Sequence, residues 1–320
     1  MLYFIWSYMR GVTAPVFFTV SGFIFSYLLF KNFKLGWSNP RVKKGVKRGT
    51  LLIVIGYVLQ IRFARLWEGS INPSFDIVHV LQSLGLSMLL IILLYLLVFR
   101  LKLYIFQLLL GSITVLLFMA SATFEQWEYG FLPEVVSNYF TERNGSVFTI
   151  VPWFGFATAG ACLAGFFHTN LNKGVFYRNV LLILPIIALI LIFQSYEFIK
   201  DLGNLTKIEF FDNALQKSYL FARLGVVLLV FVPFVLLRNF WNHKILLDIG
   251  QNTLVIYVLH CIVLYGSITG FGLDRYYHHS LPFSHAIIGA ITFMVLIGSI
   301  VLIAGKQIKR IKPKTITGFN

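Results

Sequence analysis

The sequence contains few charged residues and very few acidic ones. Only 12 of its 320 residues are aspartate or glutamate, against 27 lysines and arginines, and charged residues make up 12% of the chain while 58% are hydrophobic. Soluble domains carry about 25% charged residues, so this composition argues against a soluble protein. The longest connections between apolar runs, 122–146 and 196–218, are too short to form a core of their own.

Cysteine is also scarce. The two cysteines, Cys162 and Cys261, lie inside apolar runs, where they are expected to pack as small side chains and not to form a disulfide. No group of cysteines and histidines has metal-site spacing, because the neighbouring His278 and His279 would point in different directions on a helix. The sequence therefore predicts no metal cofactor.

Nine long apolar runs divide the chain. A helix needs about 20 apolar residues to cross a bilayer, and in lipid the backbone must satisfy its own hydrogen bonds, which favours helices. The sequence predicts an all-α, polytopic membrane bundle that forms a single transmembrane domain over residues 1–320. The runs are 11–30, 49–67, 77–99, 103–121, 147–167, 177–195, 219–238, 251–270 and 284–305.

Positive charge is concentrated on every second connection. The connection 31–48, the later connections at 100–102, 173–178 and 238–244, and the tail carry most of the basic residues, with Asp248 as their only acid. The positive-inside rule makes this side, with the C-terminus, cytoplasmic. The charge then suits the bilayer and anionic cytosolic ligands, and nucleic acid is a poor partner. A homo-oligomer is compatible with these features.

The predicted topology has a consequence for the N-terminus. Nine spans with a cytoplasmic tail place residue 1 outside, yet the chain opens without the basic, apolar and small-residue regions of a signal peptide. We expect that one or more helices precede this sequence in the complete protein.

Polar residues line one face of the third run. Asp76, His79, Ser83 and Ser87 follow helical spacing, and Gln82 borders them. Polar groups inside a membrane are costly and need a reason. The face either lines a cavity near the outer surface, with His79 as a proton acceptor, or forms hydrogen bonds between helices.

The eighth run carries a second polar stripe. Thr253, Tyr257, His260 and Ser267 share one face, and His260 lies near mid-span, where a neutral, hydrogen-bonded imidazole is expected. His260 is either a base or site residue, with Tyr257 contacting the substrate, or a packing residue.

Two sets of basic residues could bind anions. Near the outer side, Arg10 and Arg223 either bind an anionic acceptor, orient carboxylates such as Asp76, itself a candidate contact for the acceptor, or extend to lipid phosphates. In the connection 31–48 the cations exceed what orientation requires, so they either bind a phosphate-bearing ligand or form a general lipid-facing patch. The first choices for ligand contacts are Lys43, Lys44, Lys47 and Arg48.

Three stretches resemble a known family. They are Met9-Arg-Gly-Val-Thr-Ala-Pro-Val-Phe-Phe-Thr-Val-Ser-Gly22 with the basic connection after it, Val151-Pro-Trp-Phe-Gly-Phe156, and Asn252-Thr-Leu-Val-Ile-Tyr-Val-Leu-His260. Their order and spacing resemble the transmembrane acyltransferases related to heparan-alpha-glucosaminide N-acetyltransferase and, more loosely, the acyltransferase-3 family. The resemblance covers essentially the whole chain and looks bacterial.

The resemblance implies a reaction and a location. Such proteins move an acyl group, usually acetyl, from cytosolic acyl-CoA to a sugar hydroxyl or amine outside, here across a bacterial inner membrane. The basic residues 43–48 would then hold the phosphates of coenzyme A. The family histidine precedes the Arg-Gly-x-Thr-Ala-Pro stretch, but the nine residues before Arg10 contain no histidine. This departure agrees with the expected missing helix and leaves His79 and His260 as candidate bases.

Two other functions remain open. In a transporter or flippase of lipid-linked sugars the two polar stripes would line a path, although no internal repeat of the kind common in transporters is evident. In a catalytically inactive remnant the chain would fold without turnover.

Overall fold

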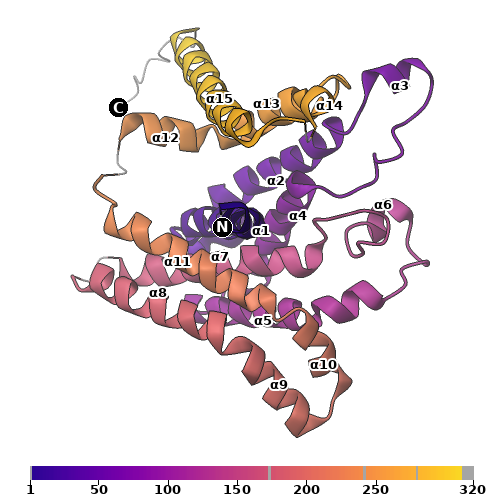
Figure 1. Cartoon of the computed structure of the whole chain (residues 1–320). Coiled ribbons are helices and arrows are strands. Elements are labelled where there is room, and N and C mark those ends of the chain that lie inside the picture. The colour runs from indigo at the N-terminus through magenta and orange to yellow at the C-terminus, as the bar shows by residue number, and fades with distance from the viewer. Residues whose placement is uncertain (1, 172–173, 241–242, 279, 312–320) are drawn as a thin grey trace. The chain divides into compact units, whose positions relative to one another are not determined.

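The computed structural model describes residues 2–171, 174–240, 243–278 and 280–311, and these form helices joined by short loops (Figure 1). His279 and the basic tail beyond residue 311 lie outside the described residues. The helices are α1 (Leu2–Phe30), η1 (Phe33–Ser38), α2 (Pro40–Val58), α3 (Phe63–Trp67), α4 (Val80–Val98), α5 (Leu103–Gln126), α6 (Glu134–Ser137), α7 (Ile150–Asn170), α8 (Phe176–Phe193), α9 (Ser195–Thr206), α10 (Glu209–Gln216), α11 (Tyr219–Leu236), α12 (Lys244–Gln251), α13 (Thr253–Tyr265), α14 (Leu273–Tyr277) and α15 (Phe283–Ile311).

The chain folds into two compact units. Unit 1 comprises residues 1–57 and 76–236, and unit 2 comprises residues 58–75 and 237–320. Unit 1 therefore contains α1, α2 and α4 to α11, while unit 2 contains α3 and α12 to α15. Each unit is described by itself below.

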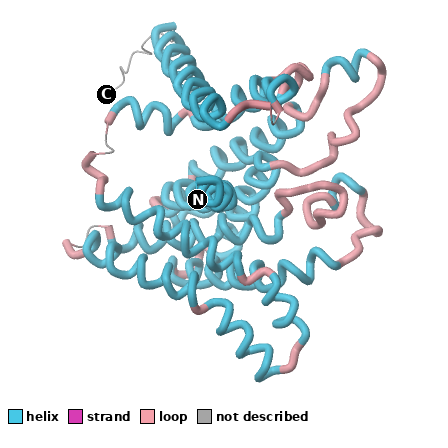
Figure 2. Tube along the Cα trace, in the orientation of Figure 1, coloured by secondary structure: helices cyan, strands magenta, loops and turns pink. Residues whose placement is uncertain are grey.

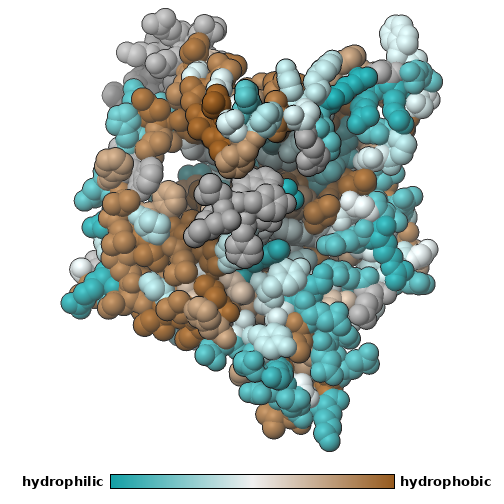
Figure 3. Space-filling model, viewed as in Figure 1, coloured by the Kyte–Doolittle hydropathy of each residue, from teal (hydrophilic) through white to brown (hydrophobic). Residues whose placement is uncertain are grey.

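Seven of the described helices are long and apolar enough to cross a membrane, namely α1 from Tyr8 onward, α4, α5, α7, α8, α11 and α15. Together, α12 and α13 form an eighth candidate, bent by 66° at Asn252. In unit 1, apolar side chains gather over α8 and α11 (Figure 3). The predicted all-α membrane bundle is confirmed.

The predicted number of nine spans is too high for the described residues. The run 49–67 is not one helix: α2 ends at Val58, and α3 has five residues after a non-helical connection (Figure 2). α2 instead begins at Pro40 and includes the basic cluster in its first turns, so it lacks a continuous apolar stretch of the required length.

Asn39 explains why α2 begins where it does. Its side-chain Oδ1 accepts a hydrogen bond from the Arg41 backbone N–H at 3.0 Å, which is an N-cap interaction. Its Nδ2 donates to the carbonyls of Leu29 and Asn32 and to the Tyr95 hydroxyl at 3.0, 3.1 and 3.3 Å. One fully buried asparagine thus joins the end of α1, the start of α2 and α4.

The small residues of α7 bring it against α1. A Cβ atom at Gly160 would overlap the Thr19 carbonyl, and one at Gly22 would overlap the Ala157 carbonyl. Backbones can approach this closely only where side chains are absent or small. Gly160 and Ala157 of α7 therefore allow it to pack closely against α1, and α7 is the most buried of the candidate spans.

Unit 1 has two chemically different ends. At one end, the Lys34 ammonium donates to the carbonyls of Arg100 and Leu101 at 3.2 and 2.8 Å, so two of the basic connections meet. We call this the basic end. The opposite end, called the His79 end, contains the start of α4 and the connection 127–149, which are joined by hydrogen bonds.

Unit 2 combines the segment 58–75 with the last helices. The Phe63 N–H donates to the Ile268 carbonyl at 3.1 Å, and Arg62 and Ile268 form an isolated parallel bridge. Gly266 ends α13 with a φ of 66°, and a Cβ there would lie 2.6 Å from the Gly272 nitrogen. This position therefore requires glycine both for its conformation and for its contacts.

Candidate functional site

His79 directly precedes α4, and its backbone is positioned by a distant loop. Asn138 donates from its side chain to the Asp76 carbonyl at 3.0 Å, and the Val78 N–H donates to the Ser146 hydroxyl at 3.0 Å. The His79 side chain is exposed, but the surrounding protein shields enough of the imidazole to lower its pKa. Because the pKa is lowered, the neutral ring with a free lone pair is favoured at neutral pH.

A tyrosine pair lies at the same end of unit 1. The hydroxyls of Tyr57 at the end of α2 and Tyr139 in the outer connection are 3.1 Å apart. Burial, together with the Tyr57 hydroxyl, raises the pKa of Tyr139 well above its usual value, so the Tyr139 phenol stays protonated and can donate a hydrogen bond. The sequence pattern does not indicate this pair, because only the fold brings residues 57 and 139 together.

Below His79, three polar residues of α4 are buried without hydrogen-bond partners among the described residues. Gln82 and Ser83 are fully buried and Ser87 is 1% exposed, and neither amide atom of Gln82 nor either serine hydroxyl is bonded. We call these three residues the polar row. Buried polar groups without partners are rare in proteins and call for an explanation. One explanation is that a ligand supplies the missing partners.

The amide of Gln82 is held against α2. A Cβ at Gly56 would lie 2.5 Å from both Cδ and Oε1 of Gln82. The absence of a side chain at Gly56 therefore creates the space that the Gln82 amide occupies. Gln82 thus lies at the α2–α4 interface, and the polar row begins three residues after His79.

Arg223 lies beside α1 near the start of α11. Its guanidinium is 4.5 Å from the ring centre of Tyr219, and a Cβ at Gly11 would lie 3.3 Å from its Nη2 atom. The predicted neighbours Arg10 and Arg223 therefore belong to the same part of unit 1, since Arg10 precedes Gly11. A half-buried guanidinium held on an aromatic ring is suited to binding an anionic or hydroxyl-rich group.

A second charged group of unit 1 joins α5 to the connection between α10 and α11. Lys217 forms an ion pair with Glu125 at 2.6 Å, and both side chains are about three-quarters shielded from solvent. Burial raises the pKa of the nearby Glu142, and the Glu125 charge raises it further, although Lys217 opposes both effects. The sequence pattern did not indicate this group, because its members come from α5, the connection 138–149 and the connection between α10 and α11.

His260 lies in α13 of unit 2 and is part of a small aromatic group. Its Nδ1 is 3.0 Å from the Tyr257 carbonyl, and its ring lies 5.4 and 5.5 Å from the rings of Tyr257 and Tyr265. A carbonyl oxygen can only accept, so Nδ1 donates in this hydrogen bond. The predicted hydrogen bond of His260 is present, and its role in a site stays a prediction.

The four basic residues predicted to contact a phosphate-bearing ligand lie together on α2. All four side chains are exposed, while Val42, Gly45 and Gly49 on the opposite face are buried. Residues four apart lie one above the other on a helix, so the cations form two adjacent pairs. We call Lys43, Lys44, Lys47 and Arg48 the basic quartet.

The predicted site residues divide between the two units. His79, Asp76, Arg10, Arg223 and the basic quartet belong to unit 1, whereas His260 and Tyr257 belong to unit 2. Unit 1 alone thus contains a cationic surface at one end, a histidine at the other and the polar row on α4 between them.

The fold defines a polytopic helical membrane protein. A family model described as heparan-alpha-glucosaminide N-acetyltransferase, catalytic, matches residues 1–208. The chain belongs to this family of membrane N-acetyltransferases, as the resemblance in its sequence indicated. No curated protein and no solved structure matches the chain. The match includes His79 and the basic quartet and ends before His260.

Proposed function

We propose that this protein transfers an acetyl group from acetyl-CoA, bound at the basic end, to a sugar hydroxyl or amine bound at the His79 end. Membership of the N-acetyltransferase family supports the reaction class. The observation that carries the assignment of the residues is the polar row, whose buried amide and hydroxyls have no hydrogen-bond partner among the described residues and begin three residues after His79.

The basic end suits the donor. Coenzyme A carries several phosphate groups, and the exposed basic quartet of α2 offers four cations on one helix face, with Lys34 and Arg100 at the same end of unit 1. By the positive-inside rule this end faces the cytosol, where acyl-CoA is made available. The bilayer itself is the remaining partner, through seven apolar helices.

The polar row suits the thioester. His79 and Ser87 are eight residues apart, which corresponds to about 12 Å along a helix. A pantetheine arm that entered from the basic end would provide the amide and carbonyl groups that Gln82, Ser83 and Ser87 lack. The Gln82 amide could then donate to the thioester oxygen as negative charge develops on it.

His79 suits the role of general base. In the reaction, the acceptor nitrogen or oxygen attacks the thioester carbon, the carbon–sulfur bond breaks, and coenzyme A leaves as a thiolate. The acceptor proton passes to His79 and from there to the leaving thiolate or to water, so atoms and charge balance. Asp76, Arg10 and Arg223 would position the acceptor at this end.

His260 is the second candidate base. The Tyr257 carbonyl lies 3.0 Å from its Nδ1 and fixes the orientation of the ring. It lies outside the residues matched by the family, so the matched part of the chain favours His79. Variants of the two histidines distinguish these assignments.

The test measures acetyl transfer by the purified protein in nanodiscs, with radiolabelled acetyl-CoA and glucosamine or glucosaminides as acceptors. Loss of a general base lowers the rate by about 10²–10⁴-fold, so we expect this loss in His79→Ala. His285→Ala serves as a matched control, because His285 is an exposed histidine on α15. Unchanged rates in both His79→Ala and His260→Ala would contradict the proposed site.

Transport of a lipid-linked sugar is a second candidate, because an unpartnered polar row could also line a path across the membrane. The same nanodisc preparation separates the two functions. Radiolabel on the acceptor supports an acyltransferase. Acceptor movement in proteoliposomes without any acetylated product would support a transporter.

A further inference from the structure

Three side chains at the basic end of unit 1 have no role in the site described above. Tyr27 lies in the last turn of α1, Lys31 directly follows that helix, and His168 lies in the last turn of α7. The Tyr27 and His168 rings meet edge to face with centroids 6.0 Å apart, and the Lys31 ammonium nitrogen is 5.8 Å from the centre of the Tyr27 ring. We call these three residues the aromatic–cation group.

The exposure of the aromatic–cation group makes it accessible to a ligand. Tyr27 and His168 are half-buried, and Lys31 is exposed. Neither the Tyr27 hydroxyl nor a His168 ring nitrogen forms a hydrogen bond with another residue that the structure describes. A tyrosine hydroxyl can donate and accept, and a neutral imidazole has one donor and one acceptor. The group therefore combines two aromatic rings, hydrogen-bonding atoms of both kinds and one positive charge.

Packed rings hold the aromatic–cation group in place. Phe23 stacks on Tyr27 with centroids 6.2 Å apart and meets Phe167 edge to face at 5.1 Å. The ring of the buried Phe30 lies 6.4 Å from that of His168. Because these neighbours fix the positions of Tyr27 and His168, the two rings lose little conformational freedom when a ligand binds.

The aromatic–cation group lies within reach of a donor that occupies the polar row. From Phe30, contacts between rings continue through Phe33 to Tyr95 on α4, with centroid separations of 6.0 and 5.4 Å. Ser87, the last member of the polar row, precedes Tyr95 by eight residues, which corresponds to about 12 Å along the helix. A pantetheine arm has about as many main-chain bonds as four residues and spans roughly 14 Å when extended. The diphosphate and ribose extend the donor further, so its base can reach the group.

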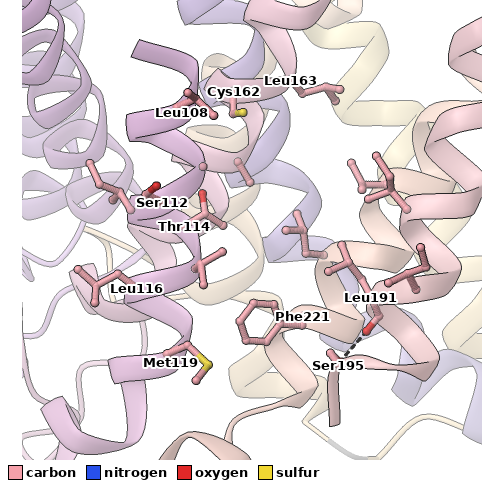
Figure 4. Close-up of a pocket in the computed structure, with 18 of the residues that line it drawn as sticks. Leu108, Ser112, Thr114, Leu116, Met119, Cys162, Leu163, Leu191, Ser195 and Phe221 are labelled. Atoms are coloured by element: carbon pink, nitrogen blue, oxygen red, sulfur yellow. Dashed lines mark hydrogen bonds between the residues drawn. The ribbon is translucent and has the colours of Figure 1, made fainter. Parts of the chain in front are cut away.

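The large groove of unit 1 is a poorer place for a nucleotide. It has a volume of about 1590 Å³ and is lined by α5, α7, α8 and α11, together with α9 and α10 (Figure 4). Its lining is mostly apolar, with Gln107, Ser112 and Gln194 among the polar side chains, and no charged residue is among the described residues that line it. The phosphates of a nucleotide bind most strongly to cations, which the basic end offers and the groove does not.

We infer that the aromatic–cation group binds the adenosine part of the acyl donor, with the purine against the Tyr27 and His168 rings and a phosphate beside Lys31. This inference rests on the proposed function, and it assigns the nucleotide a subsite of its own apart from the basic quartet. Aromatic side chains bind a base by stacking, and the free hydroxyl and imidazole nitrogens complement the donors and acceptors on the edge of a purine. A lipid phosphate would use the cation alone.

Tyr27→Leu tests the subsite, because leucine keeps an apolar side chain against Phe23 but has no ring for a base to stack on. Tyr27→Phe restores the ring without the hydroxyl. His168→Leu removes the second ring from the other helix and serves if Tyr27→Leu does not fold. Tyr104→Leu is the matched control, because Tyr104 also has a lysine at its ring, with Lys102 Nζ 6.0 Å from the centre, but lies at the start of α5.

The measurement compares acetyl-CoA, acetyl-dephospho-CoA and acetyl-pantetheine as donors in nanodiscs, with glucosamine or a glucosaminide as acceptor. Stacking of one base changes affinity by about 5- to 150-fold, so Tyr27→Leu should raise the KM for the two donors that contain adenosine at least about fivefold. The KM for acetyl-pantetheine should stay at the wild-type value, as should all three KM values in Tyr104→Leu. Tyr27→Phe should recover most of the loss, because it keeps the ring.

Three results would overturn the inference. An equal rise in KM for all three donors would mean that only packing was lost, and an unchanged KM for acetyl-CoA in Tyr27→Leu and His168→Leu would exclude the group from donor binding. A rise confined to acetyl-CoA would assign the group to the ribose phosphate and not to the purine.

If no donor is used, the proposed function fails, and binding of etheno-CoA, whose modified adenine is fluorescent, then tests the subsite separately. Quenching of this fluorescence by the wild type and by Tyr104→Leu, but not by Tyr27→Leu, would preserve a nucleotide site. No quenching by the wild type, or equal quenching by all three proteins, would remove it.

Discussion

Replacement of Asn39 by alanine should destabilise unit 1 strongly, because this side chain is fully buried and connects three elements. Loss of its N-cap bond to Arg41 costs about 1 kcal/mol. Loss of its amide removes one donor from the Leu29 carbonyl and one from the Asn32 carbonyl, at about 0.5–1.5 kcal/mol for each hydrogen bond, because both carbonyls keep a backbone donor. The expected total is about 2–4 kcal/mol.

The assay is reversible unfolding of the purified protein in mixed micelles, followed by tryptophan fluorescence as the fraction of SDS increases. Asn32→Ala is the matched control, because the Asn32 side chain is exposed and makes no cap hydrogen bond, and it should change stability by less than about 0.5 kcal/mol.

Tyr95→Phe provides an internal check. The Tyr95 hydroxyl accepts from Asn39 and donates to the Phe33 carbonyl at 2.8 Å, so its loss alone should cost about 1–1.5 kcal/mol. Because the two side chains share a bond, the double variant should lose less than the sum of the single losses. An Asn39→Ala protein as stable as the wild type would refute the reasoning.

Three further predictions follow from the site and the packing. Glutamine at all four positions of the basic quartet should raise the KM for acetyl-CoA at least tenfold while kcat is retained, and an unchanged KM would leave these residues with a topological role. Because the pKa of His79 is lowered, kcat/KM should rise with pH with a midpoint below the usual histidine pKa of about 6.5. A midpoint above that value would exclude His79 as the base. Gly160→Leu should prevent folding, because its side chain would overlap the backbone of α1, whereas Gly289→Leu on the open face of α15 should elute as the wild type does in size-exclusion chromatography.

The same lowered pKa predicts a stability effect. The folded state binds fewer protons at His79 than the unfolded chain does between the two pKa values, so stability should increase as pH rises through that window. The contribution is complete above the unfolded pKa and is lost as pH falls toward the folded one. The His79→Gln variant should lack this increase in the same micelle titration.

Much of the membrane architecture could be predicted from local pattern. Apolar runs of about 20 residues specify helices wherever water is absent, so seven of the nine predicted spans are single helices in the structure and an eighth is the bent pair α12–α13. The prediction of one span over residues 49–67 was wrong. The helix begins at Pro40, after the capping residue Asn39, and hydropathy does not indicate where a helix is capped. The small-residue stripe of α7 was predictable for the same reason as the spans, since glycine spacing is visible in the sequence.

The candidate site was predictable only in part. Helical spacing placed His79, Ser83 and Ser87 on one face, and the composition of residues 41–48 identified the basic quartet. The pairing of Tyr57 with Tyr139, and that of Glu125 with Lys217, joins residues 82 and 92 positions apart, which no local pattern indicates. The groove likewise depends on how six helices pack.

The sequence by itself determined that this chain spans a membrane many times, that its basic residues are concentrated on every second connection, and to which family it belongs. Those properties depend on composition and order along the chain, because bilayer thickness and charge act on each segment separately. The tertiary structure alone decided that Gln82 is buried without a partner among the described residues and that Asn39 joins three elements. Those properties depend on contacts between distant segments, which exist only after the helices have packed.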